Sequence, residues 1–320
     1  MKYIGNCNTK RISKIGLGTG RFGTKISEGL SFEMLDTFFE NGGTLVDTAR
    51  NYYEWVDGGR GKSEECIGKW IEDRKCRKDV CISTKCGVKN NGHMWYINLS
   101  EKNLEQELNE SLEALRTDYI DIYLLHRDEP ERPVEEIVET MQYLKEKGNV
   151  DIIGVANWNY NRVKAANDYA QKHGMIPFKT VQTWWSLAEY KYEMWADENT
   201  THMDDQMYEY MRNSNMFGMA YTSQCKGFFQ KAVKYGLENV DEFLKHRIVT
   251  ERNLKKLDYI KSYCNEYNVS ATAFVNSYIT SNRLEGVALV SCTNIMQLKE
   301  ILNECNFALD EKIISEIDAI

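Results

Sequence analysis

Polar side chains that can move protons stand where short apolar runs of this sequence end. Asp47 follows the run TLV, Lys85 ends CISTK, and His126 ends DIYLLH. Each alone has a structural explanation, because an aspartate can cap a turn, a lysine can extend along the surface and a histidine can be hydrogen-bonded in the core. Burying Lys and Asp is costly unless they pair, so their recurrence at equivalent positions predicts a shared acid–base site. Three further runs carry Asn157, Gln182 and Tyr221 at or near their ends.

Eight such apolar runs, each followed by a segment of helical periodicity, account for most of the chain. In the segment 99–117, for example, four leucines recur at helical spacing and form one apolar stripe. Parallel strands that are each followed by a helix form a sheet that is covered on both faces. The strand candidates are 14–17, 44–48, 80–85, 121–126, 152–157, 180–184, 216–221 and 287–291.

Eight units in 320 residues favour closure into a (β/α)8 (TIM) barrel, with residues 1–320 as one domain. The alternative is an open doubly wound sheet, whose phosphate-binding turn the cluster GLGTGRFG resembles. A glycine cluster alone is weak support, and no acidic residue ends the following strand in the expected register. Residues 1–13, with a turn at 6–9, are predicted to form a β-hairpin that closes the barrel floor. The strand ends of a closed barrel share one rim, and barrel active sites lie there.

Composition argues against several classes of function. A net charge of -8 and a pI near 5.4 disfavour a nucleic-acid partner, which requires a basic face. No stretch approaches the roughly 18 apolar residues of a membrane span, and the first residues lack the apolar core of a secretory signal. The nine cysteines are scattered without metal-ligand spacing, so we expect reduced core thiols and no metal. These features predict a cytoplasmic protein with neither a membrane nor a nucleic-acid partner.

Several motifs, taken in order, resemble the aldo-keto reductase family. GGTLVDTARNYYEW followed by GKSEECIG is similar to the family's Asp-Thr-Ala, Tyr, Ser-Glu and Ile-Gly pattern. ISTKCG resembles its lysine strand, and TDYIDIYLLHRDEP resembles its histidine strand. GVANWN, VQTWWSL, AYTSQCKGFF and LVSCTNIMQLKEIL follow in family order, so the resemblance covers nearly the whole chain. It is most similar to a branch with an extended loop after the catalytic tyrosine.

The resemblance implies a catalytic tetrad of Asp47, Tyr52, Lys85 and His126, with Tyr52 as the general acid in carbonyl reduction and the base in alcohol oxidation. A free tyrosine has a pKa near 10, and an ammonium about 4 Å away stabilises its phenolate by roughly 4 kcal/mol at an effective dielectric near 20. Lys85 is therefore expected to make Tyr52 more acidic. Asp47 would anchor that lysine, and His126 would orient the substrate oxygen. Tyr53 is the adjacent alternative, and the spacing from Asp47 favours Tyr52.

The same resemblance implies a nicotinamide cofactor, whose ring carries the hydride chemistry. Asn157 and Gln182 would hold its carboxamide, and Tyr221 would stack on its ring. The other residues implied for the cofactor are Thr19 and Gly20 after the first barrel strand, Thr222, Ser223, Gln224, Lys226 and Gly227 after the seventh, and Ser291, Cys292, Thr293, Gln297 and Glu300 near the eighth.

Departures from the family pattern affect how tightly the cofactor is expected to bind. Ala156 replaces the usual serine before the asparagine, and Thr293 and Gln297 stand where Lys or Arg commonly binds the 2′-phosphate. Without a cation, that phosphate loses charge-assisted hydrogen bonds worth roughly 1.5–3 kcal/mol each. NADP(H) is the family default and NAD(H) is the alternative. Lys226 is the nearby cation that favours NADP(H).

The implied function is NAD(P)(H)-dependent reduction of an aldehyde or ketone, sugar-like ones included, by a monomer. Segment 188–205 is expected to form another loop over the rim. Two other functions stay open: a cofactor-binding regulatory subunit with little turnover, and a metal-dependent hydrolase, which needs more rim ligands than His126 and Asp47 provide. Substrate contacts are predicted at Trp55, Trp95, Arg127, Trp158 and Trp185. For the tryptophans, the alternative is that they pack loops onto the barrel.

Overall fold

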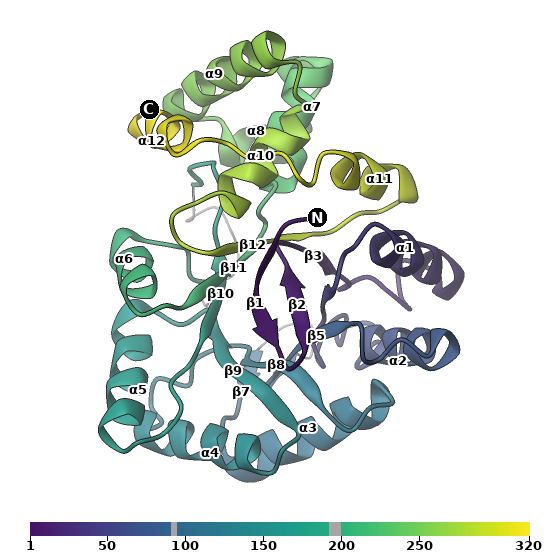
Figure 1. The fold of residues 1–320 in the computed structure, drawn as a ribbon, viewed down its shortest axis with the longest axis vertical. Coiled ribbons are helices and arrows are strands. Elements are labelled where there is room, and N and C mark those ends of the chain that lie inside the picture. The colour runs from purple at the N-terminus through teal and green to yellow at the C-terminus, as the bar shows by residue number, and fades with distance from the viewer. Residues whose placement is uncertain (91–94, 192–199) are drawn as a thin grey trace.

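The computed structural model describes residues 1–90, 95–191 and 200–320. Eight parallel strands close into a barrel that helices surround (Figure 1). Each strand coincides with one of the eight predicted runs, so the predicted (β/α)8 barrel is confirmed. In barrel order the strands are β3 (Ile15–Gly18), β4 (Leu45–Asp47), β5 (Cys81–Cys86), β8 (Ile120–Leu125), β9 (Val150–Ala156), β10 (Thr180–Trp184), β11 (Phe217–Tyr221) and β12 (Gly286–Val290), which pairs with β3.

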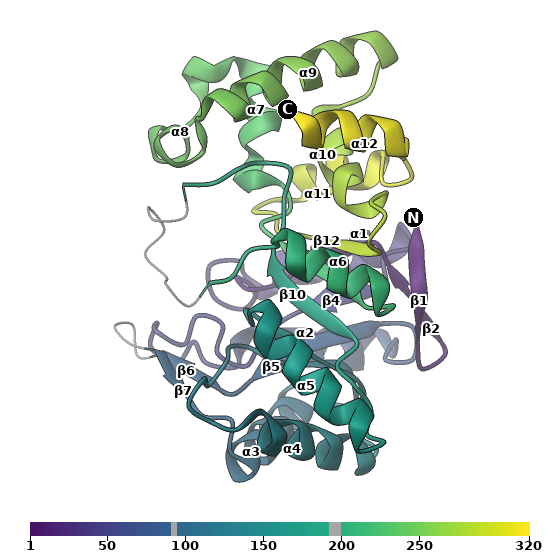
Figure 2. The ribbon, with the colours of Figure 1, turned by 90° about the vertical axis from the view of Figure 1, so that its left-hand side faces the viewer.

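The helices depart from simple alternation late in the chain, where four of them, α7 to α10, separate β11 from β12. Figures 1 and 2 show this group together with α12 at one side of the barrel. None of the helices in the described ranges is long and apolar enough to cross a membrane. The helices are α1 (Glu28–Glu40), α2 (Lys62–Arg74), α3 (Glu101–Ala114), α4 (Val134–Glu146), α5 (Tyr160–Lys172), α6 (Asp205–Asn213), α7 (Phe228–Tyr235), α8 (Glu242–Ile248), α9 (Glu251–Tyr267), α10 (Ala271–Thr280), α11 (Ile295–Asn303) and α12 (Glu311–Ala319).

Local sequence explains where several helices begin and end. The side chains of Ser27, Asn159 and Asp204 accept backbone N–H groups at the starts of α1, α5 and α6. Gly148 and Gly174 follow the ends of α4 and α5 with φ of 83° and 68°. This is the left-handed conformation predicted for glycines at helix ends, where a side chain would be strained.

The N-terminal hairpin forms as predicted, from β1 (Tyr3–Cys7) and β2 (Lys10–Ser13). Ile4, Cys7 and Ile12 on the hairpin are buried in one cluster with Leu45 and Cys81. Those last two residues begin β4 and β5, at the N-terminal ends of the barrel strands. The hairpin therefore closes the barrel floor, and the opposite end of the barrel holds the rim on which the polar residues lie.

Two further segments lie at the rim. A hairpin of β6 (Val88–Asn90) and β7 (Trp95–Ile97) follows β5, and its residues 91–94 lie outside the described ranges. Part of the predicted loop over 188–205, residues 192–199, lies outside them as well. Residues 201–203 lie beside the end of β10. The Trp184 N–H donates to the Thr201 carbonyl (3.1 Å), and the Trp184 carbonyl accepts the Met203 N–H (2.9 Å).

Candidate active site

Three of the predicted catalytic side chains meet where β4 and β5 end. Lys85 Nζ lies 2.8 Å from Asp47 Oδ2 and 2.8 Å from the Tyr52 hydroxyl oxygen. The Tyr52 hydroxyl also lies 3.4 Å from Asp47 Oδ2. A third hydrogen bond joins Lys85 Nζ to the Thr48 carbonyl at 2.7 Å, so every proton of the ammonium has an acceptor. Neighbouring strands supply the ion pair, and the turn after β4 supplies the phenol.

The Asp47 carboxylate is held on both oxygens. Oδ2 accepts from Lys85, while Oδ1 accepts from Ser83 Oγ and Gln182 Nε2, each at 2.9 Å. The side chains of Asp47 and Lys85 are 3% and 0% exposed. A buried ion pair is stable only when its remaining lone pairs and protons are bonded, and these donors meet that condition. Ser83 was not predicted, although it lies two residues before Lys85 and therefore on the same face of β5.

The pKa of Tyr52 departs from the expectation based on sequence. Burial raises the pKa, the Lys85 ammonium lowers it, and the Asp47 carboxylate raises it again, so the net pKa lies above the ordinary value. The expectation of a phenol made acidic by Lys85 is wrong in its net direction. That expectation included the charge of Lys85. It left out two effects that raise the pKa, which are the loss of solvent on burial and the charge of the Asp47 carboxylate. At neutral pH the phenol is protonated and can donate.

His126 completes the group at the end of β8. Its ring contacts the Tyr52 ring edge to face, with centroids 6.0 Å apart, and its backbone N–H bonds the Cys86 carbonyl at 2.9 Å. Its Nδ1 is buried and has no hydrogen-bond partner within the described ranges. Burial, followed by the charges of Lys85 and Arg127, lowers the pKa of His126 well below 6.5. The imidazole is therefore neutral at neutral pH, and its Nδ1 is hydrogen-bonded to none of the protein groups in those ranges.

Acid should destabilise the protein through His126. This histidine is neutral when folded and becomes charged when unfolded, so its contribution is complete above its unfolded pKa near 6.5 and is lost as the pH falls below that value. The slope from one group reaches about 1.4 kcal/mol per pH unit. Denaturant unfolding between about pH 5 and pH 8 should give a flatter slope for His126→Gln than for the wild type. The exposed His173 supplies the control: equal slopes in His126→Gln and His173→Gln would contradict the prediction.

Buried charges that the sequence did not predict hold the turn that carries Tyr52. Arg50 NH1 bonds Glu64 Oε2 at 3.1 Å, and the Glu64 side chain has no exposed surface. Glu64 Oε1 accepts from the Thr84 hydroxyl at 2.7 Å. Because Thr84 precedes Lys85 on β5, this chain of contacts links the tyrosine turn to the lysine strand. Removing Arg50 would leave the buried Glu64 carboxylate without its cation, whereas Arg50 also pairs with Glu110 at 3.2 Å.

The residues expected to hold the nicotinamide lie at or near the ends of the neighbouring strands β9, β10 and β11. The Tyr221 hydroxyl donates to Asn157 Oδ1 at 2.7 Å, and Asn157 Nδ2 lies 3.3 Å from the His126 carbonyl. Asn157 has a left-handed backbone (φ 59°), which asparagine tolerates better than most residues. Gln182 reaches Asp47, as described above. The amides and the phenol therefore continue the tetrad into one polar strip along the rim.

The loop after β11 turns sharply through several residues with left-handed backbone. Successive N–H groups in such turns form concave sites that bind phosphate groups. Ser223 has a structural contact instead, because its hydroxyl donates to the Leu289 carbonyl at 2.9 Å. Positive φ angles occur at Thr222 (55°), Cys225 (54°), Lys226 (51°) and Gly227 (79°).

Lys226 has two cationic neighbours from distant parts of the chain. Burial lowers the pKa of Lys226, and the charges of Arg247 and Arg21 lower it further. The Lys226 ammonium and the Arg247 guanidinium lie 5.8 Å and 3.7 Å from the centroid of the Phe243 ring. Three cations gathered in one place favour an anionic ligand. The sequence predicted Lys226 alone, because Arg21 precedes α1, Arg247 lies in α8, and no local pattern joins them.

The cofactor residues predicted near β3 and β12 mostly contact other protein groups. Gln297 Oε1 accepts from the Thr293 N–H (2.8 Å) and hydroxyl (3.0 Å), and Glu300 Oε1 accepts from the Thr272 hydroxyl (2.8 Å). Their side chains therefore stabilise the start of α11 and its contact with α10. Of the others, Thr19 and Cys292 are buried, Gly20 lies against the Tyr52 ring, Gln224 is half-buried and Ser291 is exposed.

Two predicted substrate tryptophans lie near the tetrad on the rim. Trp55 is 48% exposed, and its ring stacks on Tyr53 with centroids 5.0 Å apart. Tyr53 is thus turned toward Trp55, and it is Tyr52 that contacts the lysine. Trp95 on β7 lies against the guanidinium of Arg127, 4.4 Å from its ring centroid. Arg127 directly follows the tetrad histidine.

The other two predicted substrate tryptophans are core residues. Trp158 and Trp185 are 1% and 5% exposed. The Trp158 ring packs against Phe178, and the Trp185 ring packs against Tyr208 of α6. Their prediction as substrate contacts is corrected to the packing role that the sequence left open.

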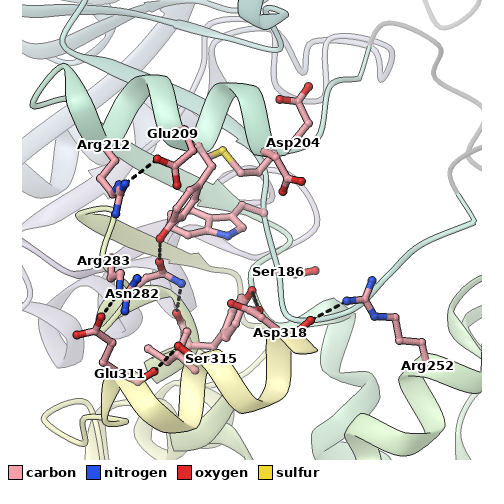
Figure 3. A pocket seen from close by; sticks show the side chains of 16 residues that line it. Ser186, Asp204, Glu209, Arg212, Arg252, Asn282, Arg283, Glu311, Ser315 and Asp318 are labelled. Atoms are coloured by element: carbon pink, nitrogen blue, oxygen red, sulfur yellow. Dashed lines mark hydrogen bonds and ion pairs between the residues drawn. The ribbon is translucent and has the colours of Figure 1, made fainter. Parts of the chain in front are cut away.

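A cavity of about 370 Å³ lies away from the tetrad, beside α6, α9 and α12 (Figure 3). Each of its arginines is bonded to a protein acceptor: Arg212 to Glu209 at 2.7 Å, Arg252 to the Asp318 carbonyl at 2.8 Å, and Arg283 to Glu311. No residue of the tetrad lines the cavity. The candidate active site is therefore the rim.

Comparison with known proteins agrees with the motifs. The model of the Aldo/keto reductase family matches residues 14–320. Norsolorinic acid reductase of Aspergillus flavus is 28% identical, over 96% of this chain and 77% of its own length. Norsolorinic acid reductase A of Aspergillus parasiticus is 27% identical over the same shares, and aldo-keto reductase YhdN of Bacillus subtilis is 29% identical over 71% of this chain and 63% of its own. The predicted resemblance is confirmed: this chain belongs to the aldo/keto reductase family of oxidoreductases.

Proposed function

We propose that this protein reduces an aldehyde or ketone to an alcohol with NADP(H), using Tyr52 as general acid and base. The observation that carries the proposal is the 2.8 Å contact between the Tyr52 hydroxyl and Lys85 Nζ, on a lysine that Asp47 holds at 2.8 Å. His126 faces the same phenol. A protonated phenol, an ammonium and a neutral imidazole are the groups that proton transfer to a carbonyl oxygen requires.

The rim fits a nicotinamide dinucleotide. His126 Nδ1 is a buried polar atom with no partner in the described part of the chain, and the Asn157 amide bonds the backbone carbonyl of the same histidine. The loop after β11 and the cations near Lys226 suit phosphate groups. When it is bound, the nicotinamide ring supplies or accepts the hydride.

The protein's own part of the reaction is proton transfer and charge stabilisation. In reduction, Tyr52 donates its proton to the substrate oxygen, and the Lys85 ammonium stabilises the phenolate that remains. Asp47 and the Thr48 carbonyl keep that ammonium in place. Neutral His126 donates a hydrogen bond to the substrate oxygen and orients it. In alcohol oxidation the Tyr52 phenolate takes the proton back.

We favour NADP(H) over NAD(H) because three cations gather near the loop after β11. Lys226, Arg247 and Arg21 are close enough for the two arginines to lower the pKa of the lysine. A 2′-phosphate carries the additional negative charge that such a cluster would bind. Thr293 and Gln297, which replace expected cations, bond each other instead. The cluster would thus compensate for the departures near β12.

Replacing Lys226 by Met should weaken NADPH binding by about 10- to 100-fold, since a charge-assisted hydrogen bond is worth roughly 1.5–3 kcal/mol. NADH binding should change much less. Fluorescence titration of both cofactors measures the effect. Lys234 is an exposed lysine near the end of α7, the helix that follows Lys226, and Lys234→Met should bind as the wild type does. An equal loss for both cofactors would assign Lys226 to the shared pyrophosphate and contradict its selective role.

The rim favours substrates with a flat or sugar-like ring. Trp55 and Trp95 lie there partly exposed, and tryptophan faces pack well against both kinds of ring. Norsolorinic acid, for which two relatives are named, belongs in the same test set.

The deciding experiment measures NADPH consumption with a panel of aromatic, aliphatic and sugar aldehydes and ketones, and NADP reduction with the matching alcohols. Turnover that depends on both cofactor and carbonyl supports the proposal. Tight cofactor binding without turnover of any member would instead favour a regulatory subunit.

A further inference from the structure

Two thiols and a carboxylate meet at the barrel floor, at the opposite end from the tetrad. Cys7 ends β1 of the N-terminal hairpin, Cys81 begins β5, and Asp121 lies in β8. The two Sγ atoms and a carboxylate oxygen lie within 4.8 Å of one another, and all three residues are fully buried. The two thiols are close enough for Cys81 to raise the pKa of Cys7. The pair thus connects a terminal hairpin directly to a barrel strand.

The carboxylate in this group already has cationic partners. Asp121 pairs with Lys10 and with Arg77, whose NH1 lies 2.9 Å from Oδ2. It also accepts the Ile82 N–H at 2.8 Å. A metal ion would have to displace the Lys10 ammonium and remove a proton from each thiol. The neighbouring Cys81 thiol and burial raise the pKa of the Cys7 thiol, which opposes that exchange.

We propose that Cys7 and Cys81 form a reversible disulfide that locks the N-terminal hairpin to the barrel floor. The sulfur atoms are already neighbours and need to approach to about 2.05 Å. The product is neutral, so forming it buries no new charge beside the Asp121 ion pairs. A disulfide here therefore suits the site better than a metal ion does.

The co-reactant is a low-molecular-weight disulfide such as glutathione disulfide. A cysteine exposed by opening of the hairpin attacks it as the thiolate and releases one glutathione, leaving a mixed disulfide. The second cysteine attacks the protein sulfur of that mixed disulfide and releases the second glutathione. Two electrons and the two thiol protons pass to the two glutathione products. Because both cysteines are buried when the hairpin is closed, opening of the hairpin limits the rate.

The expected consequence is a more stable oxidised protein. The bond joins positions separated by β2, β3, α1, β4 and α2, so it constrains a long loop of the unfolded chain. We expect the melting temperature to rise by about 5 °C on oxidation and to fall back after reduction.

The test uses the full chain, reduced, equilibrated with glutathione disulfide, alkylated, digested and mapped by mass spectrometry. The expected product is a peptide pair joined through Cys7 and Cys81 that dithiothreitol separates, together with the higher melting temperature. Cys7→Ser and Cys81→Ser should each abolish both effects, and Cys7→Ala covers the case in which serine weakens the hairpin. Cys76→Ser is the matched control, because Cys76 is also buried but lies outside the group, and it should retain both effects.

Three results would overturn the proposal. One is that both thiols stay reduced under conditions in which the reduced protein is alkylated at Cys7 and Cys81. Another is a disulfide that joins Cys7 to a different cysteine, or oxidation that leaves the melting temperature unchanged or lower. The third is that Zn²⁺ alone protects both thiols from alkylation, which would assign the group to metal binding.

Discussion

Replacing Tyr52 by Phe should lower kcat by about 10²- to 10⁴-fold, the usual contribution of a positioned general acid, and leave NADPH affinity nearly unchanged. Phenylalanine keeps the ring that packs against Gly20 and His126 but removes the hydroxyl that contacts Lys85. The substrate oxygen then has no phenol from which to take a proton. Single-turnover rates with a fluorescence titration of NADPH separate the chemical step from binding.

Tyr53→Phe is the matched control, because Tyr53 is the adjacent tyrosine and stacks on Trp55. It should retain turnover close to that of the wild type. If Tyr52→Phe were as active as Tyr53→Phe, the proton donor would lie elsewhere on the rim. If the two variants lost activity equally, the effect would come from the shape of the turn and not from the Tyr52 hydroxyl.

Barrel closure explains why the tetrad could be predicted from sequence. Each strand is buried on both faces and therefore appears as a short apolar run, so a polar residue such as Asp47 or His126 marks a strand end. Once eight such strands close into a barrel, their C-terminal ends share one rim, independent of the conformation of the loops. Tyr52 was implied by the family resemblance, and it lies in the turn that follows β4.

Features that depend on loops and solvent could not be predicted. Arg247 acts on Lys226 from α8, in the four-helix segment after β11, and Arg21 acts on it from the segment between β3 and α1. Local periodicity does not encode how two such distant segments fold together. Trp158 and Trp185 follow strands directly, and a tryptophan there can face either the mouth or the outer wall of the barrel. The sign of the Tyr52 pKa shift required the balance of burial against two opposite charges, which depends on coordinates.

Replacing Lys85 by Met should destabilise the fold as well as abolish turnover. The lysine side chain has no exposed surface, and its ammonium is bonded to Asp47, Tyr52 and the Thr48 carbonyl. Methionine fills a similar volume but leaves the Asp47 carboxylate buried without a cation. Breaking a buried pair from one side costs about 3–5 kcal/mol, which denaturant unfolding measures directly.

A double variant separates the charge from the packing. Lys85→Met combined with Asp47→Asn removes both charges and should recover most of the lost unfolding free energy, because Ser83 and Gln182 border a neutral amide instead of an unpaired carboxylate. Turnover should stay absent, since no ammonium remains to stabilise the Tyr52 phenolate. If Lys85→Met alone were as stable as the wild type, solvent would have to reach the carboxylate. If the double variant recovered no stability, the loss would come from packing around the methionine, and the ion pair would not be what stabilises this end of the barrel.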